Sequence, residues 1–442
     1  MRPVTLLLAL FLALPALAQD TRAVYVVSQG AFGGNNADVV RIVPGQGAAA
    51  VLTGRPYTQG AQIIGDRLYL TAGGGDASRV DVVDLGTGEP EAQVTDGLVN
   101  PRYLAGVAPG VAFVTNQTYS YVTTDDPYVS VLDLSTNAVT GTIPVVRQPE
   151  GIAATGGRAY VSLSGFGERD SLAVLDIAAQ SLIGYLDIGC LARLVFADAD
   201  GEVLAVCPEE VVVLDGATGG VVARVAAPAP IQVGFAQEAA FDPRTQTLVA
   251  LADRSSDGAS DPVVLRFDAT TNAFGAPVEI DGVAPSAIGV DGPAERLYLG
   301  RPNANRDIAF SAPGTVSVVT FAGEQVAEYA AGVYPTYVAV FTQAPPVATA
   351  PEAGRGGLGL ALAGPNPVRG RTAFAVTLDR PAPVTVTLYD VLGRPVATLA
   401  DGALGAGTHP VAFDAGALPA GVYLARLVSE GGAAHVAVTV AR

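Results

Sequence analysis

The side chains with the most chemical potential in this sequence are arginines, tyrosines, amides and carboxylates in the turns between apolar runs. They recur at intervals of about 45 residues, so a repeating fold could gather them at one place. Arginine and tyrosine together suit a polar, partly planar ligand. The residues predicted to bind a ligand are Arg55, Tyr57, Asn100, Arg102, Arg147, Glu150, Arg193, Gln237, Glu238 and Tyr334. The competing interpretation is that the arginines and glutamates pair in a structural ring.

Histidine is nearly absent from the chain. His409 and His435 are the only two, so the first four fifths of the sequence cannot build a Ser-His-Asp triad or a histidine-ligated metal site. The acidic loops do not match the spacing of a calcium-binding loop. We therefore predict no catalytic residue and no metal site. The alternative is an enzyme, a lyase or hydrolase, that acts through tyrosine, arginine and carboxylates.

Two cysteines flank a short hairpin. Cys190 stands just before the apolar runs of residues 194–206, and Cys207 stands just after them. No CxxC spacing or further metal ligand accompanies them, and paired cysteines in an exported chain usually form a disulfide. We predict a Cys190–Cys207 disulfide.

The elements that must position these side chains are β-strands in a repeat. Residues 147–189 contain four short apolar runs separated by turn residues, which predicts a four-stranded meander. The second run recurs at intervals of 44 to 49 residues, with its middle residue at Tyr25, Tyr69, Phe113, Tyr160, Leu204, Val249 and Tyr298. Seven units of this length predict an all-β, seven-bladed β-propeller.

Two further features refine the repeat. An aspartate closes the third run in five units, at Asp84, Asp133, Asp176, Asp215 and Asp268, and we expect it to bond turn amides rather than to act in catalysis. An additional run at residues 335–341 matches the first run of other units. It should complete the first blade and leave no free sheet edge.

Composition limits the class of partner. All 25 basic residues are arginine, against 42 acidic residues, and the formal net charge is −17. Such a charge repels nucleic acid. With 50% hydrophobic residues and 15% charged residues, the chain is typical of a well-packed globular protein.

Four segments are predicted. Residues 1–18 have the basic start, short apolar core and small-residue end of a cleavable signal peptide, and the core is too short to be a transmembrane segment. The propeller occupies 19–343, and a Pro/Ala/Gly-rich linker spans 344–357. Alternating runs in 358–442 predict a small Ig-like β-sandwich.

The last domain resembles the C-terminal sorting domain of the type IX secretion pathway of Bacteroidota. The matching stretches are Pro365-Asn366-Pro367, LYDVLGRPVATL at 388–399 and LPAGVYLARL at 418–427. This resemblance implies export through the periplasm to the cell surface or the medium, with the type IX machinery as a partner.

The propeller looks like the YncE-like, YVTN-repeat family, through its aromatic-Val strand, its V-x-V-x-D strand and the turn that follows. VVSQGAFGGNNADV near the start, NPRY at 100–103 and RQPEG at 147–151 are similar to a surface subgroup that captures cobalamin for an outer-membrane transporter. The resemblance implies cobalamin as a ligand, but no ligand-contacting residue follows from it.

The first function predicted is therefore a non-enzymatic binding propeller at the cell surface. A structural adhesin that binds a protein through the same face is the alternative.

Overall fold

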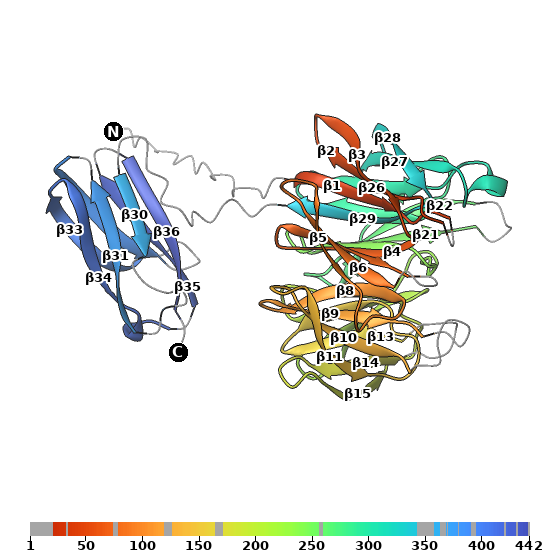
Figure 1. Ribbon diagram of the computed structural model, residues 1–442, viewed down its shortest axis with the longest axis horizontal. Coiled ribbons are helices and arrows are strands. Elements are labelled where there is room, and N and C mark those ends of the chain that lie inside the picture. Colours follow the sequence, from red (N-terminus) through yellow and green to blue (C-terminus); the bar gives the residue numbers. More distant parts are fainter. Residues whose placement is uncertain are drawn as a thin grey trace, which may run out of the picture. The chain divides into compact units, whose positions relative to one another are not determined.

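The computed structural model of the chain (Figure 1) describes residues 21–440, apart from 32–33, 74–77, 119–125, 164–170, 256–259, 343–357, 363–367, 369, 379, 390–394, 420 and 430–431. The signal peptide predicted at 1–18 and the linker predicted at 344–357 lie outside these residues. The chain divides into two compact units, Met1–Thr342 and Gln343–Arg442. In the part described, no helix is long and apolar enough to cross a membrane.

The first unit is a propeller of seven antiparallel sheets. Each sheet is a blade, written here from the innermost strand outward. The first three blades are β29 (Pro335–Thr342), β1 (Thr21–Ser28), β2 (Ala37–Val43) and β3 (Gly47–Arg55); β4 (Thr58–Ile64), β5 (Arg67–Ala72), β6 (Arg79–Asp84) and β7 (Pro90–Val94); and β8 (Pro101–Ala108), β9 (Val111–Asn116), β10 (Tyr128–Asp133) and β11 (Ala138–Pro144).

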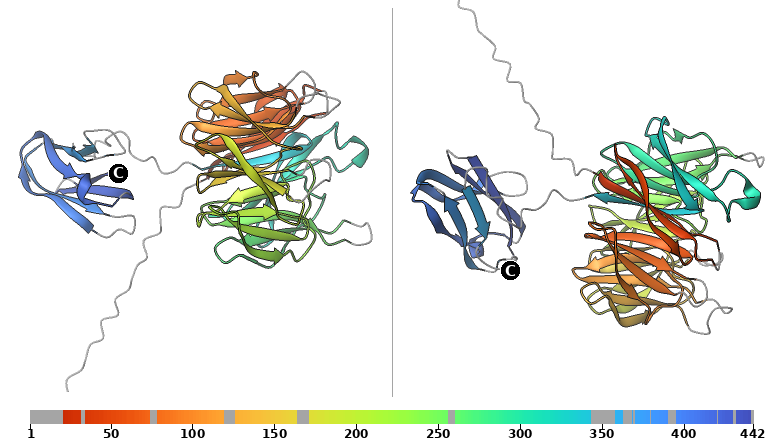
Figure 2. Two further views of the ribbon diagram at one scale, coloured as in Figure 1. Left: turned by 90° about the horizontal axis from the view of Figure 1, so that it is seen from below. Right: turned by 45° about the horizontal axis from the view of Figure 1, so that its top comes forward.

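The remaining blades follow in chain order, and Figure 2 shows the sheets arranged around a common centre. They are β12 (Ile152–Thr155), β13 (Arg158–Ser162), β14 (Ser171–Asp176) and β15 (Ser181–Asp187); β16 (Leu194–Ala197), β17 (Glu202–Val206), β18 (Glu210–Asp215) and β19 (Val221–Ala226); β20 (Ala239–Asp242), β21 (Thr247–Asp253), β22 (Pro262–Asp268), β23 (Ala273–Phe274) and β24 (Val278–Glu279); and β25 (Ala287–Asp291), β26 (Arg296–Arg301), β27 (Pro313–Thr320) and β28 (Gln325–Val333). A 3-10 turn, η3 (Arg306–Ile308), precedes β27.

The repeated apolar run forms the second strand of every blade, as predicted. β5 and β13 are buried on both faces, because each blade packs against neighbours on both sides. Their central residues, Tyr69 and Tyr160, are among the largest fully buried side chains. Burying one such side chain contributes about 2 kcal/mol. Apolar packing between blades therefore explains why this run recurs.

The ring closes through the C-terminal strand of the unit. β29 pairs with β1 in antiparallel register, with Val24 opposite Val340 and Val26 opposite Val338 (Figure 1). The predicted completion of the first blade is confirmed. Both ends of the propeller chain are thereby tied into a single sheet.

The expectation that closure leaves no free sheet edge is wrong. Each blade still has an outermost strand with one unpaired side. In five blades the pairing of the third and fourth strands shifts by one residue at the same place, for example between Val174 and Leu175 and between Val213 and Leu214. In the first blade the register shifts nearer the start of the third strand, between Ala37 and Val39 and between Val39 and Val40. In the sixth blade the outer strand is broken into β23 and β24 instead. Such bulges and breaks protect exposed edges from pairing with another chain.

The aspartates at the ends of the third strands bond turn amides. Asp84 Oδ1 accepts from the Thr87 backbone N–H at 2.7 Å, and Asp215 Oδ1 accepts from that of Thr218 at 2.7 Å. Asp133, Asp176 and Asp268 accept equivalent bonds. Hydrogen bonds from Thr87 hold the pKa of Asp84 below its usual value. Their role is structural, as expected.

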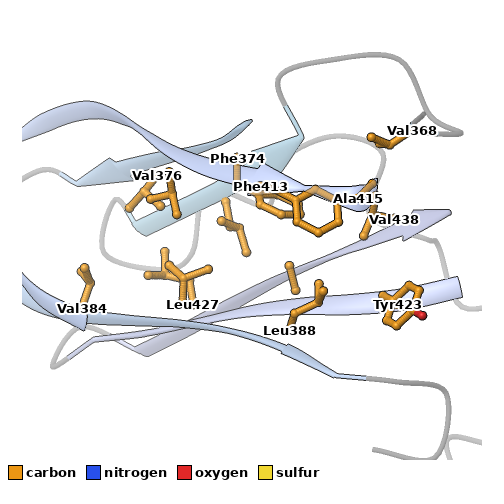
Figure 3. Close-up of a cluster of buried hydrophobic side chains, with 14 of the residues drawn as sticks. Val368, Phe374, Val376, Val384, Leu388, Phe413, Ala415, Tyr423, Leu427 and Val438 are labelled. Atoms are coloured by element: carbon orange, nitrogen blue, oxygen red, sulfur yellow. The ribbon is translucent and has the colours of Figure 1, made fainter. Parts of the chain in front are cut away.

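The second unit is a two-sheet sandwich. One sheet contains β30 (Leu358–Leu362), β31 (Arg371–Leu378) and β34 (Gly407–Asp414). The other contains β33 (Pro395–Leu404), β32 (Ala382–Tyr389), β35 (Gly421–Ser429) and β36 (Gly432–Val440), and η4 (Ala415–Ala417) follows β34. Phe374 and Phe413 of the first sheet face Leu388 and Leu427 of the second in the core (Figure 3). The unit therefore has its own hydrophobic core, which fits the predicted β-sandwich.

Candidate functional site

One buried polar residue stands at or just before the start of each innermost strand. Because these starts lie at one end of the central channel, the seven residues form a ring that we call the mouth ring. Its members in blade order are Thr336, Gln59, Arg102, Glu150, Arg193, Glu238 and Ser286. The four central members alternate in charge, so an ordered network of ion pairs can form around the mouth.

The charged members of the ring are connected from blade to blade. Arg102 donates through Nη1 to Gln59 Oε1 at 2.5 Å and through Nε to Glu150 Oε2 at 3.2 Å. Arg193 lies between two carboxylates, with Nε 3.7 Å from Glu150 Oε2 and Nη1 3.3 Å from Glu238 Oε2. The predicted structural ring of arginines and glutamates is therefore present.

Two tyrosines and a glutamine fill the axis beneath the ring. The rings of Tyr103 and Tyr337 meet edge to face with centroids 6.0 Å apart, and Tyr103 packs against the hydrophobic clusters of several blades. Burial raises the pKa of both phenols. Gln237 donates from its side chain to the carbonyls of Ile288 and Val338 at 3.2 Å. A ligand at this mouth would therefore rest on a floor of side chains rather than pass along the channel.

Arg193 is the least satisfied charged group of the ring. Only 6% of the residue is exposed, yet its Nε and Nη2 have no hydrogen-bond partner. Its pKa is raised: burial lowers it, but electrostatic interactions with the surrounding groups, the Glu150 and Glu238 carboxylates among them, outweigh that effect. Burial raises the pKa of Glu238, and the neighbouring Arg193 offsets only part of this. The Arg193 side of the mouth thus combines a fixed cation with a carboxylate that burial disfavours as an anion.

Aromatic side chains also stand at the mouth. The aromatic arc, as we call it, comprises Tyr57, Phe235, Phe310 and Tyr334. Phe235 is 70% exposed and its ring centroid is 5.6 Å from the Arg193 guanidinium carbon, while Phe310 is 58% exposed and stacks on Tyr334 at 4.3 Å. Tyr334 is close enough to Glu238 and Tyr57 to interact with them electrostatically. The mouth therefore offers flat apolar surface beside buried charge.

Four more of the residues predicted to bind a ligand lie at or near the mouth. Asn100 accepts from Gln59 Nε2 at 2.5 Å and so supports the ring, and Gln237 joins the innermost strands. Arg147 is half-buried with a left-handed φ of 68° just before Glu150, and Tyr334 has a similar φ of 53°. Such backbone conformations cost free energy in non-glycine residues and are frequent at functional sites.

Arg55 does not join the ring. It ends the outermost strand of the first blade, and its Nη2 lies 2.5 Å from Asp81 Oδ2, which Arg79 also contacts. The sequence predicted a loop position for Arg55, which instead ends β3, and it could not indicate that the side chain turns to the third strand of the next blade.

Several residues of the site were missed. Gln59, Gln117, Tyr103, Phe235 and Phe310 all belong to the mouth, where Gln117 donates to Glu150 Oε1. Aligning the seven strand starts, YTQG, NPRY, QPEG, LARL, AQEA, APSA and YPTY, places Gln59 with Arg102 and Glu150. No comparable signal marks Phe235 and Phe310.

The predicted disulfide is confirmed. Cys190 and Cys207 are bonded, with their Cα atoms 5.9 Å apart. The bridge ties the turn before β16 to the end of β17, and Arg193 follows Cys190 by three residues. It therefore anchors the turn that carries the central arginine of the ring.

No metal-ligating cluster is found in the part of the chain that the structure covers: no three histidine, cysteine, aspartate or glutamate side chains converge there. The acidic side chains of the sixth blade bond protein groups instead. Asp253 accepts from the backbone N–H of Ser255 at 2.8 Å, and Arg254 lies 3.0 Å from Asp261.

No protein-family model matches the sequence, and no curated protein matches it. Solved structures match the fold. One match is a hydrazine synthase structure from Kuenenia stuttgartiensis, with 17% sequence identity and a TM-score of 0.50. The match spans 63% of this chain and 93% of the hydrazine synthase chain. A Bacteroides fragilis protein, whose assignment as a 6-phosphogluconolactonase is provisional, is 12% identical with a TM-score of 0.54 and covers 74% of this chain and 99% of its own. At these identities the likeness supports the all-β propeller architecture and carries no activity over to this chain.

Proposed function

We propose that this chain is an exported, non-enzymatic propeller that binds a ligand at the mouth ring. The observation that carries the proposal is the meeting, at one mouth, of a buried arginine with unused donors and aromatic rings exposed to solvent. Exposed aromatic rings are costly to leave in water, and they are frequent where a protein binds a partner. A purely structural ring would need the ion pairs but not the aromatic arc.

The non-enzymatic part of the proposal rests on how the carboxylates are used. Glu238 is the best candidate for a general acid, because burial raises its pKa. However, its Oε1 accepts from the Ala236 backbone N–H at 2.9 Å and its Oε2 accepts from Arg193. Both oxygens are thus engaged, and neither is directed toward a nucleophile. An enzyme that uses Glu238 as a general acid is the second candidate function, and it depends on this one residue.

Cobalamin is the ligand to test first, because the opening residues and the turns at 100–103 and 147–151 resemble a corrinoid-capturing subgroup. The mouth has suitable chemistry, since the amide-fringed corrin ring needs many hydrogen-bond donors together with flat apolar contacts. Arg147 and the aromatic arc could supply both.

Calorimetric titration of the full mature chain with cyanocobalamin tests this proposal. We expect heat from the wild type and from the control Arg158→Ala, whose residue begins β13 at the opposite end of the blade, and a loss of affinity in Arg147→Ala. No heat from any protein would exclude a corrinoid. Thermal stabilisation by a small-molecule panel would then support another ligand, whereas its absence would favour the adhesin.

We further propose that residues 1–18 direct export and that the C-terminal sandwich acts as a type IX sorting domain. The sandwich has a separate core, so it can be removed without cutting a propeller strand. A chain ending at Gln343 should fold but fail to reach the surface of a Bacteroidota host. Equal surface delivery of the shortened chain and the full chain would contradict the sorting role.

A further inference from the structure

We propose that the mouth takes an aromatic carboxylate, with the carboxylate bound by Arg193 and the aromatic ring packed on Phe235. The inference rests on the proposed function, because it keeps the ligand site at this mouth, and it names a chemical class of ligand other than a corrinoid. It depends on three features of the Arg193 surroundings: its unused donors, the carboxylate that it shares with Arg102, and the exposed aromatic ring that lies against it.

The first feature is the geometry of Arg193. Its contacts with Glu150 and Glu238, at 3.7 and 3.3 Å, are longer than the roughly 2.7–2.9 Å of a good charge-assisted hydrogen bond. Nε and Nη2 are buried without a hydrogen-bond partner. A guanidinium presents its donors as a planar fork that matches the two oxygens of a carboxylate. A carboxylate ligand would therefore satisfy donors that the protein leaves unused.

The second feature is the local charge. Glu150 is shared, because it accepts from Arg102 and Gln117 as well as facing Arg193. Glu238 is the other carboxylate, and its Oε2 lies 3.3 Å from Arg193 Nη1. Arg102 and Arg193 therefore share Glu150 between them, and Arg193 has no close carboxylate of its own. An anionic ligand would supply the close partner that Arg193 lacks, while a neutral ligand would not.

The third feature is the segment that carries Phe235. Residues 232–238 fold over the mouth and are held by backbone bonds from Gln232 to Leu251 and from Gln237 to Thr336, each 2.8 Å long. Gly234 lies against Glu238, because a Cβ there would be 2.4 Å from Glu238 Oε1 and that carboxylate would have to move. The segment places Phe235 above Arg193, with one face of the ring on the cation and much of the rest in solvent.

A ligand that pairs an aromatic ring with a carboxylate fits this arrangement. The ring buries exposed surface of Phe235, and the attached carboxylate reaches the guanidinium beneath. The stacked pair Phe310 and Tyr334 is a second aromatic surface at the mouth, because Tyr334 precedes the mouth-ring residue Thr336 by two positions. Ring and charge are needed together, so an aliphatic acid or a neutral aromatic amide should bind less well.

The test is ligand-observed fluorine NMR of the full mature chain with 4-fluorobenzoate, beside neutral 4-fluorobenzamide. Cyclohexanecarboxylate serves as the aliphatic acid and is measured by its ability to displace the fluorinated probe. We expect the benzoate to bind at least about tenfold more tightly than the benzamide, because it alone pairs with the guanidinium. Phe235→Ala should weaken benzoate binding by about fivefold. The control Ile183→Ala removes an exposed apolar residue from the outer strand β15 and should leave binding unchanged.

Arg193→Gln should reduce the affinity for benzoate by about tenfold or more. Arg193→Lys keeps the positive charge but loses the planar pair of donors, so its affinity should lie between those of the wild type and Arg193→Gln. If Arg193→Gln does not fold, Arg193→Lys and Phe235→Ala still decide the question. Equal binding of benzoate and benzamide, unchanged binding in Phe235→Ala, or no binding by the wild type would each overturn the inference. The proposed function fails separately, through the cobalamin titration and the small-molecule panel.

Discussion

Strand β20 (Ala239–Asp242) runs from one buried arginine–carboxylate cluster to another. Glu238, just before the strand, belongs to the mouth ring with Arg193, and Asp242 ends the strand at the opposite end of the channel. There Asp242 forms a second group, which we call the base cluster, with Arg244 and Asp291. Both clusters are built from arginine–carboxylate pairs, but they differ in how many of their polar groups have a hydrogen-bond partner.

The base cluster is fully satisfied. Arg244 binds Asp242 through Nε at 2.9 Å and Nη2 at 2.6 Å, contacts Asp291 at 2.9 Å and donates to Thr21 at 3.3 Å. The Gly292 backbone N–H also donates to Asp242 at 2.7 Å. Burial raises the pKa of Asp242, but the bonds from Arg244 and Gly292 outweigh it and the pKa is lowered. The cluster connects the sixth, seventh and first blades where the ring closes.

The mouth differs because two nitrogen atoms of Arg193 have no hydrogen-bond partner and because the pKa of Glu238 is raised. Both clusters are buried within the same fold, so burial alone does not explain the difference. A complete set of partners is typical of a structural cluster, whereas buried donors without a partner beside an exposed aromatic ring support the proposed ligand site. The comparison therefore assigns stability to the base and supports the proposal that the mouth binds a ligand.

The largest effect is expected at the base. Asp242→Ala should lower the free energy of unfolding by about 3 kcal/mol, because it leaves the partly buried Arg244 and the Gly292 backbone N–H with fewer partners. Urea denaturation of the full chain measures this, with the exposed Asp66→Ala as control. A loss below about 1 kcal/mol would mean that the base is no better paired than the mouth.

The difference in stability between the wild type and Asp242→Ala should change with pH in one direction. The pKa of Asp242 is lower in the folded chain, so its contribution is present above the unfolded pKa of about 4 and is lost as pH falls through the folded value. The gap in stability between wild type and Asp242→Ala should therefore be largest near neutral pH and shrink in acid.

The disulfide is expected to have an effect of similar size. Replacing both Cys190 and Cys207 with serine should cost about 3 kcal/mol, given a sequence separation of 17 residues. Because the bridge anchors the turn that precedes Arg193, the variant should also weaken any ligand binding at the mouth while leaving the base cluster intact. Thermal melting with and without reductant measures the first effect. Equal melting temperatures for the oxidised and reduced wild type would contradict it.

Much of the fold follows from the sequence because it is repeated. Each second strand is buried on both faces, so the demand for Tyr69, Phe113 or Tyr160 in the middle of an apolar run leaves a strong signal. The closing strand resembles other first strands for the same reason. The outer-strand bulges left no such signal, because a bulge is one extra residue in a pairing and is visible only when both strands are aligned in space.

The candidate site was predicted less completely. Turns before innermost strands converge on the axis, which is why Arg102, Glu150 and Arg193 could be assigned to the mouth. Arg55 was misplaced because it ends an outermost strand. Phe235 was missed because its position depends on the hydrogen bonds of Gln237 to other blades, and these are made only in the folded chain.

A smaller effect with the opposite pH sign is expected at the mouth. Glu238→Gln should cost about 1 kcal/mol or less at neutral pH, because the amide oxygen can still accept from Ala236 and the buried charge is removed. The folded pKa of Glu238 is raised, so its contribution is complete below the unfolded pKa of about 4.3 and is lost as pH rises through the folded value. The difference in free energy of unfolding between the wild type and Glu238→Gln should therefore shrink as pH rises from acid toward neutral. A difference that grows with pH instead would mean that Glu238 stabilises the fold as an ionised carboxylate, as Asp242 does.

The smallest effect on stability is expected at Phe235. Because most of its ring is in solvent, Phe235→Ala should change the free energy of unfolding by no more than about 0.5 kcal/mol, measured by urea denaturation. This value includes the cation–π contact with Arg193, whose guanidinium carbon is 5.6 Å from the ring centroid; such contacts are worth about 0.5–1 kcal/mol at exposed positions and are weakest near the limit of about 6 Å. A loss above about 2 kcal/mol would show that the ring seals Arg193 as part of the folded core, and the mouth would then be a structural cluster like the base. A small loss in stability together with weakened benzoate binding would instead mean that the ring is held in solvent for a ligand, since nothing in the folding of the chain requires it there.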